Sequence, residues 1–336
     1  MKLGICCTDA LGWRVVRKRW AKCFPEAQFF HPENFGNPYL KRGLRTFAKQ
    51  WAMRKAVLAA DAAGCDRIIV ASNGEAGFIP VRIARKVAIY GDASHRQLSE
   101  LYKFNRPEAK LRNREAQMAR LAANGAKFVA MSQWCAQGFV RDYGLQTGNV
   151  GVIGPPLDLD VLDAGEELSE GPRSGALFIG GDFARKGGPM LLEAAKNLPG
   201  LQFHIVTATE VPSAPPNVTV YRGLEPESPE LLKLLWSAQM FVFPTTADCS
   251  PLAVLEAQAA ELPVIAANVG GLGDMVVSGQ HGWLIPPDRL DDLQSAIDDF
   301  LDRPVAAVEY GVAGRRRVEA ENALVAHSRR WRAVLG

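Results

Sequence analysis

The sequence predicts an α/β protein built from two Rossmann-like, doubly wound domains. Short apolar runs rich in β-branched residues alternate with helical patterns along nearly the whole chain, which is typical of parallel sheets with crossover helices. The chain has 336 residues, of which 48% are hydrophobic, enough to fill about two cores. Two such domains bind ligands at the carboxyl ends of their strands, so we expect them to face a central cleft.

The first half of the chain contains six predicted strands, separated for the most part by helical stretches. One predicted helix carries signals at both ends, because Ser132 suits an N-cap and Gly144 suits a C-terminal stop. Cys6 and Cys7 lie in the first apolar run and are expected to be two side chains of a buried strand. The predicted strands are residues 3–7, 27–30, 67–71, 87–90, 128–131 and 151–153.

The boundary between the domains is predicted just after the Pro155-Pro156 pair. The stretch from 158 to 174 is acidic and polar and shows little hydrophobic periodicity, so we interpret it as a linker. Residues 1–156 then form an N-terminal domain and residues 157–315 a C-terminal domain. The second alternation predicts strands at 176–179, 202–206, 218–221, 240–243, 264–266 and 283–285, followed by two C-terminal helices.

Charge is distributed unevenly between the two halves. Residues 1–150 hold 25 Lys and Arg against 11 Asp and Glu, a net +14, whereas residues 151–336 hold 14 against 25, a net −11. Two basic, aromatic-containing helices account for much of the excess, one over 11–24 and one over 41–55. They suit an anionic membrane surface or an acidic acceptor, or else an apolar stripe that faces the core with a solvated basic side. Nucleic acid is not expected as a partner, because no binding motif accompanies the charge.

The cysteines and the apolar runs predict a cytoplasmic protein, with a peripheral position at the inner face of the membrane as a further option. Six cysteines show no C-x-x-C pair and no zinc-type spacing, which favours reduced core thiols and no metal site. The apolar run at Met1–Cys7 is too short for a signal peptide, and the sequence nowhere has the roughly 18 consecutive apolar residues of a membrane span.

The segment from 241 to 266 carries the clearest chemistry, with the order strand, loop, helix, turn, strand. Ser250 suits an N-cap and Pro251 the first helical position, so the N–H groups of Leu252, Ala253 and Val254 would face the loop. A helix N-terminus carries about half a positive charge and unpaired donors. It can therefore accept a diphosphate without a metal ion.

Two carboxylates flank this helix end, Asp248 before it and Glu256 just beyond its first turn. Carboxylates bind sugar and ribose hydroxyls well, and a nucleotide sugar offers both on either side of its diphosphate. The spacing alone leaves a second interpretation open, in which Asp248 caps the helix and Glu256 is solvated.

These segments together resemble glycosyltransferase family 4, whose members are retaining enzymes of the GT-B fold. The match covers a third of the chain, through 177–188, 241–266, the Gly270-Gly271 turn and 281–288. The resemblance implies that Asp248 contacts the donor sugar, Glu256 the ribose and Lys186 the diphosphate. This sequence differs from the family where Asp248 replaces the usual Glu. It also has Gly181 at the position of a common Arg, and Arg185 is the available substitute.

The resemblance implies transfer of a sugar from a nucleoside diphosphate, a UDP- or GDP-sugar, to a hydroxyl acceptor without a cofactor or metal. The acceptor would be a glycan, a lipid-linked molecule or another cell-envelope component, in polysaccharide or glycolipid biosynthesis. Two alternatives stay open, a nucleotide-sugar epimerase and a non-catalytic, membrane-associated GT-B binding module. By analogy with GT-B proteins, a C-terminal helix at about 316–336 packs back on the first domain.

The residues assigned to the site fall into three groups. Catalytic roles go to Asp248, Lys186 and His95. Acceptor-side roles go to Asp92 and His95, with helix capping and a surface histidine as the alternatives. The donor-binding residues are Gly12, Gly181, Arg185, Lys186, Ser250, Pro251, Leu252, Ala253, Glu256 and Gly271.

Overall fold

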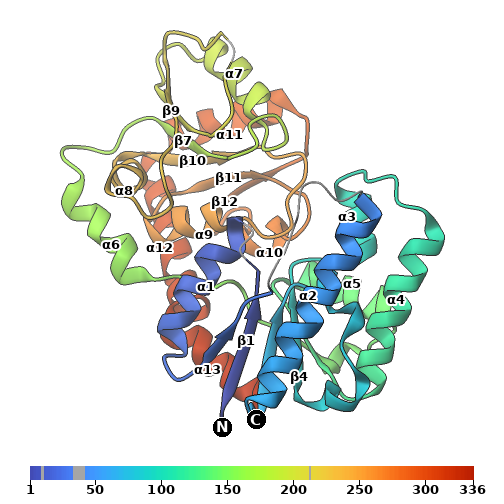
Figure 1. The fold of residues 1–336 in the computed structure, drawn as a ribbon. Helices are drawn as coiled ribbons and strands as arrows, with labels where there is room; N and C mark the ends of the chain where they lie inside the picture. Colours follow the sequence, from blue (N-terminus) through green and yellow to red (C-terminus); the bar gives the residue numbers. More distant parts are fainter. Residues whose placement is uncertain (9–10, 33–41, 212) are drawn as a thin grey trace. The chain divides into compact units, whose positions relative to one another are not determined.

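The computed structural model describes residues 1–8, 11–32, 42–211 and 213–336 (Figure 1). The described chain divides into two compact units. Unit 1 comprises Met1–Pro156 and Leu324–Gly336, and unit 2 comprises Leu157–Ala323. Within the described residues, each unit contains one six-stranded sheet whose strands all run parallel. The predicted α/β class is therefore confirmed for both halves of the chain.

The sheet of unit 1 has the order β2-β1-β3-β4-β5-β6. The chain runs from β1 to the edge strand β2 and then returns to β3, so the loops after β1 and β3 leave the sheet in different directions. A crevice forms at the carboxyl ends of strands where the order reverses in this way. The strands are β1 (Leu3–Cys7), β2 (Gln28–Phe30), β3 (Arg67–Ala71), β4 (Val87–Gly91), β5 (Lys127–Ala130) and β6 (Val150–Val152).

Helices cover both faces of this sheet, with α1 and α13 on one face and α2, α4 and α5 on the other (Figure 1). Strand β1 is buried along its whole length, so Cys6 and Cys7 are core residues as predicted. The helices are α1 (Leu11–Cys23), α2 (Arg42–Ala62), α3 (His95–Leu101), α4 (Glu108–Ala123), α5 (Gln133–Tyr143) and α13 (Leu324–Leu335). Three 3-10 turns join them, at η1 (Asn73–Phe78), η2 (Val81–Lys86) and η3 (Thr147–Asn149).

Helix α5 begins and ends at the signals that the sequence shows. The Ser132 hydroxyl accepts a hydrogen bond from the Cys135 N–H at 3.1 Å, which satisfies one of the unpaired donors of the first turn. Gly144 follows the last turn with a left-handed φ of 67°, a conformation that favours glycine. Both predicted boundaries of this helix are confirmed.

The apolar stripe of α1 faces the core of unit 1. Val16, Trp20 and Phe24 are buried, and the Trp20 ring packs edge-on against Trp331 of α13 with 6.1 Å between ring centres. The Trp20 indole N–H also donates to His327 at 2.8 Å. Of the two interpretations of this basic helix, the core-facing one therefore applies to α1.

Helix α2 differs from α1, because it presents aromatic side chains to solvent. Phe47 and Trp51 are 54% and 46% exposed and stack with 6.3 Å between ring centres. The Arg54 guanidinium lies 5.5 Å from the Trp51 ring. The side chains of three other basic residues of the predicted pattern, Lys41, Arg42 and Arg45, lie outside the described residues.

Unit 2 has the sheet order β12-β11-β10-β7-β8-β9, which reverses between β7 and β10. The strands after β7 extend to one side and the strands after β10 to the other. A ligand crevice is therefore expected beyond the carboxyl ends of β7 and β10. The strands are β7 (Ala176–Ile179), β8 (Phe203–Val206), β9 (Val218–Tyr221), β10 (Met240–Phe243), β11 (Val264–Ala267) and β12 (Gly282–Ile285).

The helices of unit 2 also cover both faces, since α7 packs with α11 and the pairs α6 with α8 and α9 with α12 lie on the other face (Figure 1). They are α6 (Leu159–Leu168), α7 (Gly188–Asn197), α8 (Pro229–Ser237), α9 (Leu252–Ala259), α10 (Leu272–Met275), α11 (Leu290–Asp302) and α12 (Pro304–Glu321). In the described part of the chain, no helix combines the length and apolar character that crossing a bilayer requires.

Helix α6 occupies part of the stretch that we interpreted as a linker, so that interpretation is wrong for Leu159–Leu168. Tertiary packing stabilises this helix. Its Gly165 lies so close to α8 that an added Cβ would be 2.4 Å from the Trp236 ring. The Trp236 indole N–H donates to the Leu162 carbonyl at 2.7 Å.

The chain returns to unit 1 at α13, and the segment before it belongs to unit 2. Residues 316–323, which the sequence analysis groups with the returning helix, lie in unit 2. Close packing of α12 explains this placement, because an added Cβ at Gly311 would lie 2.0 Å from the Glu261 carbonyl oxygen. Three helices rather than two complete the chain, since α11 precedes α12 and α13.

Candidate functional site

The candidate site of unit 2 lies in the loops after β7 and β10, where the sheet order reverses. Strand β10 is buried throughout, and its loop leads into α9. Pro251 is the N-cap of α9, with φ −71° and ψ 120°, and the helix begins at Leu252. The prediction of Ser250 as N-cap and Pro251 as first helical residue is therefore wrong by one position. Proline fixes only φ, and here its ψ is extended.

The N-cap residue of α9, Pro251, makes no side-chain hydrogen bond to the first turn. The Val254 N–H donates to the Pro251 carbonyl at 3.3 Å, within the turn itself. The N–H groups of Leu252 and Ala253 belong to the part of a helix that has no partner inside the helix. This end of α9 therefore has the donors and the dipole that an anion requires.

The loop after β7 is held against the loop after β10 by backbone contacts. The Arg185 carbonyl accepts from the Thr246 N–H at 2.9 Å and from the Thr245 hydroxyl at 3.1 Å. Gly187 has a φ of 89°, and an added Cβ there would lie 2.0 Å from the Pro244 carbonyl oxygen. Only glycine permits this approach.

Three of the predicted site residues meet at this junction. The Lys186 ammonium forms an ion pair with the Asp248 carboxylate, and both side chains are largely buried. The Arg185 guanidinium donates to the Ala247 carbonyl at 2.5 Å and lies 3.9 Å from Asp248. The Lys186 ammonium also lies 5.0 Å from the centre of the Phe243 ring. Arg185 and Lys186 thus face the same loop, beside the start of α9.

Other residues predicted to bind the donor also lie in unit 2. The Gly271 N–H donates to the Cys249 carbonyl at 3.0 Å, which ties the loop after β11 to the same place. Glu256 is partly exposed and lies in the second turn of α9. An added Cβ at Gly181 would meet nothing within 4 Å. Gly181 therefore borders open space, where a longer side chain could be accommodated.

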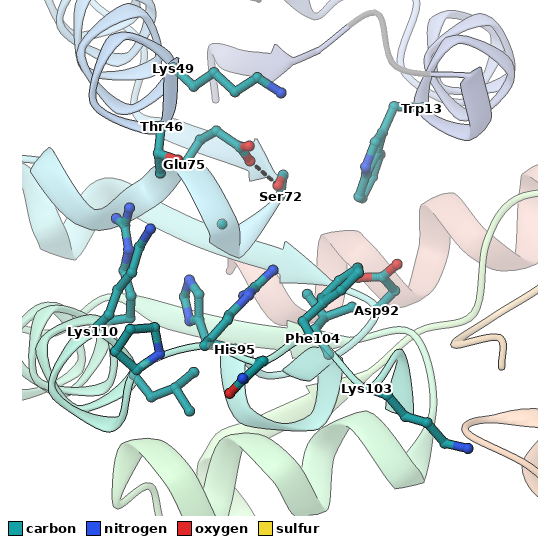
Figure 2. Close-up of a pocket in the computed structure, with 17 residues that line it drawn as sticks. Trp13, Thr46, Lys49, Ser72, Glu75, Asp92, His95, Lys103, Phe104 and Lys110 are labelled. Carbon is teal, nitrogen blue, oxygen red and sulfur yellow. Dashed lines mark hydrogen bonds between the residues drawn. The ribbon is translucent and has the colours of Figure 1, made fainter. Parts of the chain in front are cut away.

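Unit 1 contains a pocket of about 740 Å³ at the carboxyl edge of its sheet (Figure 2). Ser72 follows β3, Asp92 follows β4, and Trp13 lies on α1 after β1. Figure 2 shows Lys49 extending into the pocket from α2 and Trp13 from the other side. The pocket thus lies where the order of this sheet also reverses. Both predicted acceptor-side residues, Asp92 and His95, line it.

Positive charge dominates the lining of this pocket. The acidic residues among the lining are Asp92 and Glu75. The Glu75 carboxyl accepts a hydrogen bond from the Ser72 hydroxyl (Figure 2), and burial raises the pKa of Glu75. The basic residues are Lys49, Lys103, Arg106, Lys110 and Arg114.

His95 is a buried member of the lining and is 3% exposed. Its Nδ1 lies 2.8 Å from the Tyr143 hydroxyl, which also accepts from the His95 backbone N–H at 3.1 Å. Burial, with Arg114 and Arg106 nearby, lowers the pKa of His95 to about 3. The imidazole is therefore neutral at physiological pH. Its Nε2 is buried and has no hydrogen-bond partner among the described residues.

Lys49 belongs to the basic helix predicted over 41–55, whereas the other basic residues of the pocket were not assigned to a site from the sequence. Lys110 and Arg114 lie four residues apart on α4, a spacing that places helical side chains on one face, and Arg106 shortly precedes this helix. This spacing could have indicated a shared surface. Gly12, assigned to donor binding, is exposed at the start of α1 and is not part of the lining, although its neighbour Trp13 is.

Among the described residues, no three or more His, Cys, Asp or Glu side chains are grouped so that they could hold a metal ion.

A family of known proteins matches the unit that holds the α9 site. The sequence model of the family described as Glycosyl transferases group 1 matches residues 173–303. This range contains β7 to β12 and both loops of the Lys186–Asp248 junction.

Relatives and solved structures agree with this match. D-inositol 3-phosphate glycosyltransferase of Mycobacteroides abscessus is 27% identical over 219 residues, which are 58% of this chain and 49% of that protein. The chain thus spans about half the length of this curated relative. Sucrose-phosphate synthase of Thermosynechococcus elongatus has a TM-score of 0.75 at 19% identity, covering 100% of this chain and 96% of that one.

A second solved structure carries a nucleotide. Anabaena Alr3699/HepE, solved in complex with UDP and glucose, has a TM-score of 0.73 at 16% identity and covers 100% of this chain and 99% of that one. At these identities the structural likeness shows the fold, which is the predicted GT-B fold.

Proposed function

We propose that this chain, whose residues 173–303 match the family model of the group 1 glycosyl transferases and whose fold is GT-B, is a retaining glycosyltransferase. Unit 2 binds a nucleoside-diphosphate sugar, and unit 1 binds an acceptor through a hydroxyl. The donor is a UDP- or GDP-sugar. The UDP complex of the HepE neighbour supports a nucleotide donor.

The start of α9 and the neighbouring lysine carry this proposal. Pro251 at the N-cap gives the N–H groups of Leu252 and Ala253 no capping side chain, and Lys186 brings an ammonium to the same loop. Negative charge grows on the diphosphate as the glycosidic bond breaks, and donors fixed in advance stabilise charge where it develops. Ser250 and Pro251 shape the loop, Gly271 supports it, and Arg185 is the second cation.

The proposed chemistry breaks the bond between the anomeric carbon and the diphosphate oxygen. The acceptor oxygen attacks the same face of the sugar, and its proton passes to the departing diphosphate. Asp248 orients sugar hydroxyls, Glu256 binds the ribose, and neither needs to form a covalent bond. In unit 1, His95 and Asp92 contact the acceptor hydroxyl, and Gly12 keeps its predicted part in binding the donor.

Transfer assays test this proposal directly. The full chain is incubated with UDP-glucose, GDP-mannose and related donors, together with glycan and lipid-linked acceptors. Nuclear magnetic resonance then reads the anomeric configuration of the product. The proposal predicts a glycoside with the donor's configuration, and loss of product in Lys186→Ala and Glu256→Ala proteins that remain folded. An inverted product, or undiminished turnover in both variants, would contradict it.

The same assay separates the two alternatives. A nucleotide-sugar epimerase would convert the donor without an acceptor, whereas the proposed enzyme needs one. A non-catalytic binding module would bind the nucleotide sugar and give neither transfer nor hydrolysis across the acceptor panel.

A membrane-associated acceptor is part of the proposal because of α2. Phe47 and Trp51 form an exposed stacked pair in a basic helix, and aromatic and basic side chains together favour an anionic bilayer surface. Sedimentation with phosphatidylglycerol vesicles should therefore decrease in Trp51→Ser. Val305→Ser is the control, since Val305 is 74% exposed and lies on α12. Equal sedimentation of both variants would argue against membrane contact through α2. Localisation at the inner face of the membrane stays a prediction.

A further inference from the structure

The pocket of unit 1 holds more positive charge than binding a neutral hydroxyl requires. We propose that it selects acceptors that carry a phosphate ester, which Lys110 and Arg114 bind while His95 contacts a hydroxyl of the same molecule. This inference deepens the proposed function and rests on it, because it names the acceptor class of that enzyme.

The charge of the pocket is not neutralised by the acidic residues nearest to it in the sequence. Glu108 and Glu115 lie on α4 beside Lys110 and Arg114, yet both pair with Arg96, at 2.9 Å and 2.8 Å. Among the described residues, five basic side chains line the pocket against two acidic ones. This excess of basic residues would attract an anionic ligand.

One of these cations is partly withdrawn from water. Burial lowers the pKa of Arg114, and the nearby Glu75 carboxyl opposes that effect. Burial also raises the pKa of Glu75. A charge in a low-dielectric surrounding interacts more strongly with an added opposite charge. Arg114, whose guanidinium suits the geometry of phosphate, is therefore placed to bind one.

A residue that lines the same pocket has a buried polar atom without a partner among the described residues. His95 Nε2 has no hydrogen-bond partner among the described residues, and because His95 is only 3% exposed, bulk water does not replace that partner. Native structures rarely leave such an atom unsatisfied, so a ligand group is expected there. Because the imidazole is neutral, it suits a hydroxyl better than a phosphate. The pocket thus offers two kinds of contact. Its basic side chains can bind a phosphate ester, and the His95 ring nitrogen can bind a hydroxyl.

The size of the pocket agrees with this ligand class. Its volume of about 740 Å³ falls in the usual range for small-molecule sites, roughly 300 to 1,000 Å³. A phosphorylated monosaccharide or polyol fits such a volume. The phosphate could belong to a soluble ester or to a lipid headgroup, and the chemistry of recognition is the same for both.

Binding measurements on the full chain test the inference. Titration calorimetry compares glucose 6-phosphate with glucose, and inorganic phosphate reports the anion contact alone. We expect glucose 6-phosphate to bind at least about tenfold more tightly than glucose at low salt, with the difference shrinking as salt is added. Vesicles with and without phosphatidic acid form a second arm, which distinguishes a lipid phosphate from a soluble one.

Three variants locate the contacts. Lys110→Gln and Arg114→Gln should each weaken glucose 6-phosphate binding roughly tenfold, the usual effect of losing a charge-assisted hydrogen bond. Arg112→Gln is the matched control, because Arg112 lies on the same helix, is 76% exposed in its side chain and pairs with Glu108. His95→Phe should weaken glucose 6-phosphate but leave inorganic phosphate unchanged. Lys110 is exposed, so its variant should fold even if Arg114→Gln does not.

The outcomes separate this inference from the proposed function, since stabilisation by UDP and UDP-glucose is measured on the same samples. Equal affinity for glucose and glucose 6-phosphate, or an Arg112→Gln effect as large as that of Lys110→Gln, would overturn the inference. If donor binding and transfer to neutral glycans persisted in that case, the proposed function would stand. Phosphate-ester binding without any nucleotide-sugar binding would instead contradict the proposed function.

Discussion

The Lys186 ammonium and the Asp248 carboxylate form an ion pair that joins the loop after β7 to the loop after β10. Their side chains are 16% and 9% exposed, so the pair is largely shielded from water. The proposed roles of these residues differ, since Lys186 binds the diphosphate and Asp248 the sugar. Without a donor they neutralise each other, and a diphosphate that reaches Lys186 must compete with Asp248.

If Asp248 competes with the diphosphate for Lys186, the Asp248→Asn change should alter the affinity for UDP. The change removes the competing charge, so UDP should bind roughly fivefold to tenfold more tightly, whereas the preference for UDP-glucose over UDP should fall. Lys186→Met should weaken both ligands by about tenfold or more. Titration calorimetry with UDP and UDP-glucose measures all four affinities.

Lys196→Met is the control for this comparison, because Lys196 lies in the same unit and forms an exposed pair with Glu193. It should leave the affinities unchanged. Weaker UDP binding in Asp248→Asn would show that the carboxylate assists the diphosphate rather than competing with it.

Two glycines between β7 and α7, Gly181 and Gly187, give a second prediction, about the free energy of unfolding. Gly187→Ala places a Cβ against the Pro244 carbonyl oxygen and forces alanine into a φ of 89°, so we expect a loss of about 2 to 4 kcal/mol in the free energy of unfolding. Gly181→Ala meets nothing within 4 Å and should change it by less than about 0.5 kcal/mol. Urea denaturation compares them. Similar losses in both proteins would refute the close approach of the two loops.

The open space at Gly181 allows a third prediction, on donor affinity. Gly181→Arg adds a cation where an added Cβ meets nothing within 4 Å, at the position where the related family commonly has an arginine. UDP should then bind roughly tenfold more tightly, with a steeper salt dependence. Gly181→Gln supplies length without charge and should show no such gain. If Arg185 already supplies the whole second contact, both variants will match the parent protein.

The sequence predicted those elements whose signals are local. Ser132 caps the start of α5 with its hydroxyl, and Gly144 ends the helix in a left-handed conformation. Both residue types can be recognised in the sequence. Helix α6 escaped prediction, because Gly165 and its contact with Trp236 come from another helix. The one-residue error at Pro251 has a similar origin, since its ψ is set by the surrounding loop.

The candidate site was predicted in part for the same reason. The motif residues around α9 could be named from the sequence. Their roles in donor binding and catalysis are proposals. The ion pair of Lys186 with Asp248 depends on two loops that are 62 residues apart. The basic pocket likewise combines residues of α1, α2, α4 and the loops after β3 and β4. These segments are far apart in the sequence, so no local sequence pattern predicts that they line one pocket.

A buried histidine gives the fourth prediction, on the pH dependence of stability. Burial lowers the pKa of His327 from its ordinary value of 6.5 to about 3. Between these values the unfolded chain holds more protons than the folded one, so stability is full above about pH 6.5 and falls as the pH is lowered. The loss approaches about 1.4 kcal/mol per pH unit for this group.

His327→Gln should therefore reduce the slope of unfolding free energy against pH between about pH 6.5 and 5. The glutamine carbonyl can still accept from the Trp20 indole N–H, as His327 does at 2.8 Å. Urea denaturation at several pH values measures both proteins. An unchanged slope would mean that His327 is not held neutral in the folded state.

The position of the bound nucleotide tests the account most directly. A crystal structure of the full chain with UDP or GDP should show the diphosphate at the N–H groups of Leu252 and Ala253, with the Lys186 ammonium turned from Asp248 toward it. A nucleotide bound elsewhere, with those N–H groups blocked by side chains of the protein, would contradict the account.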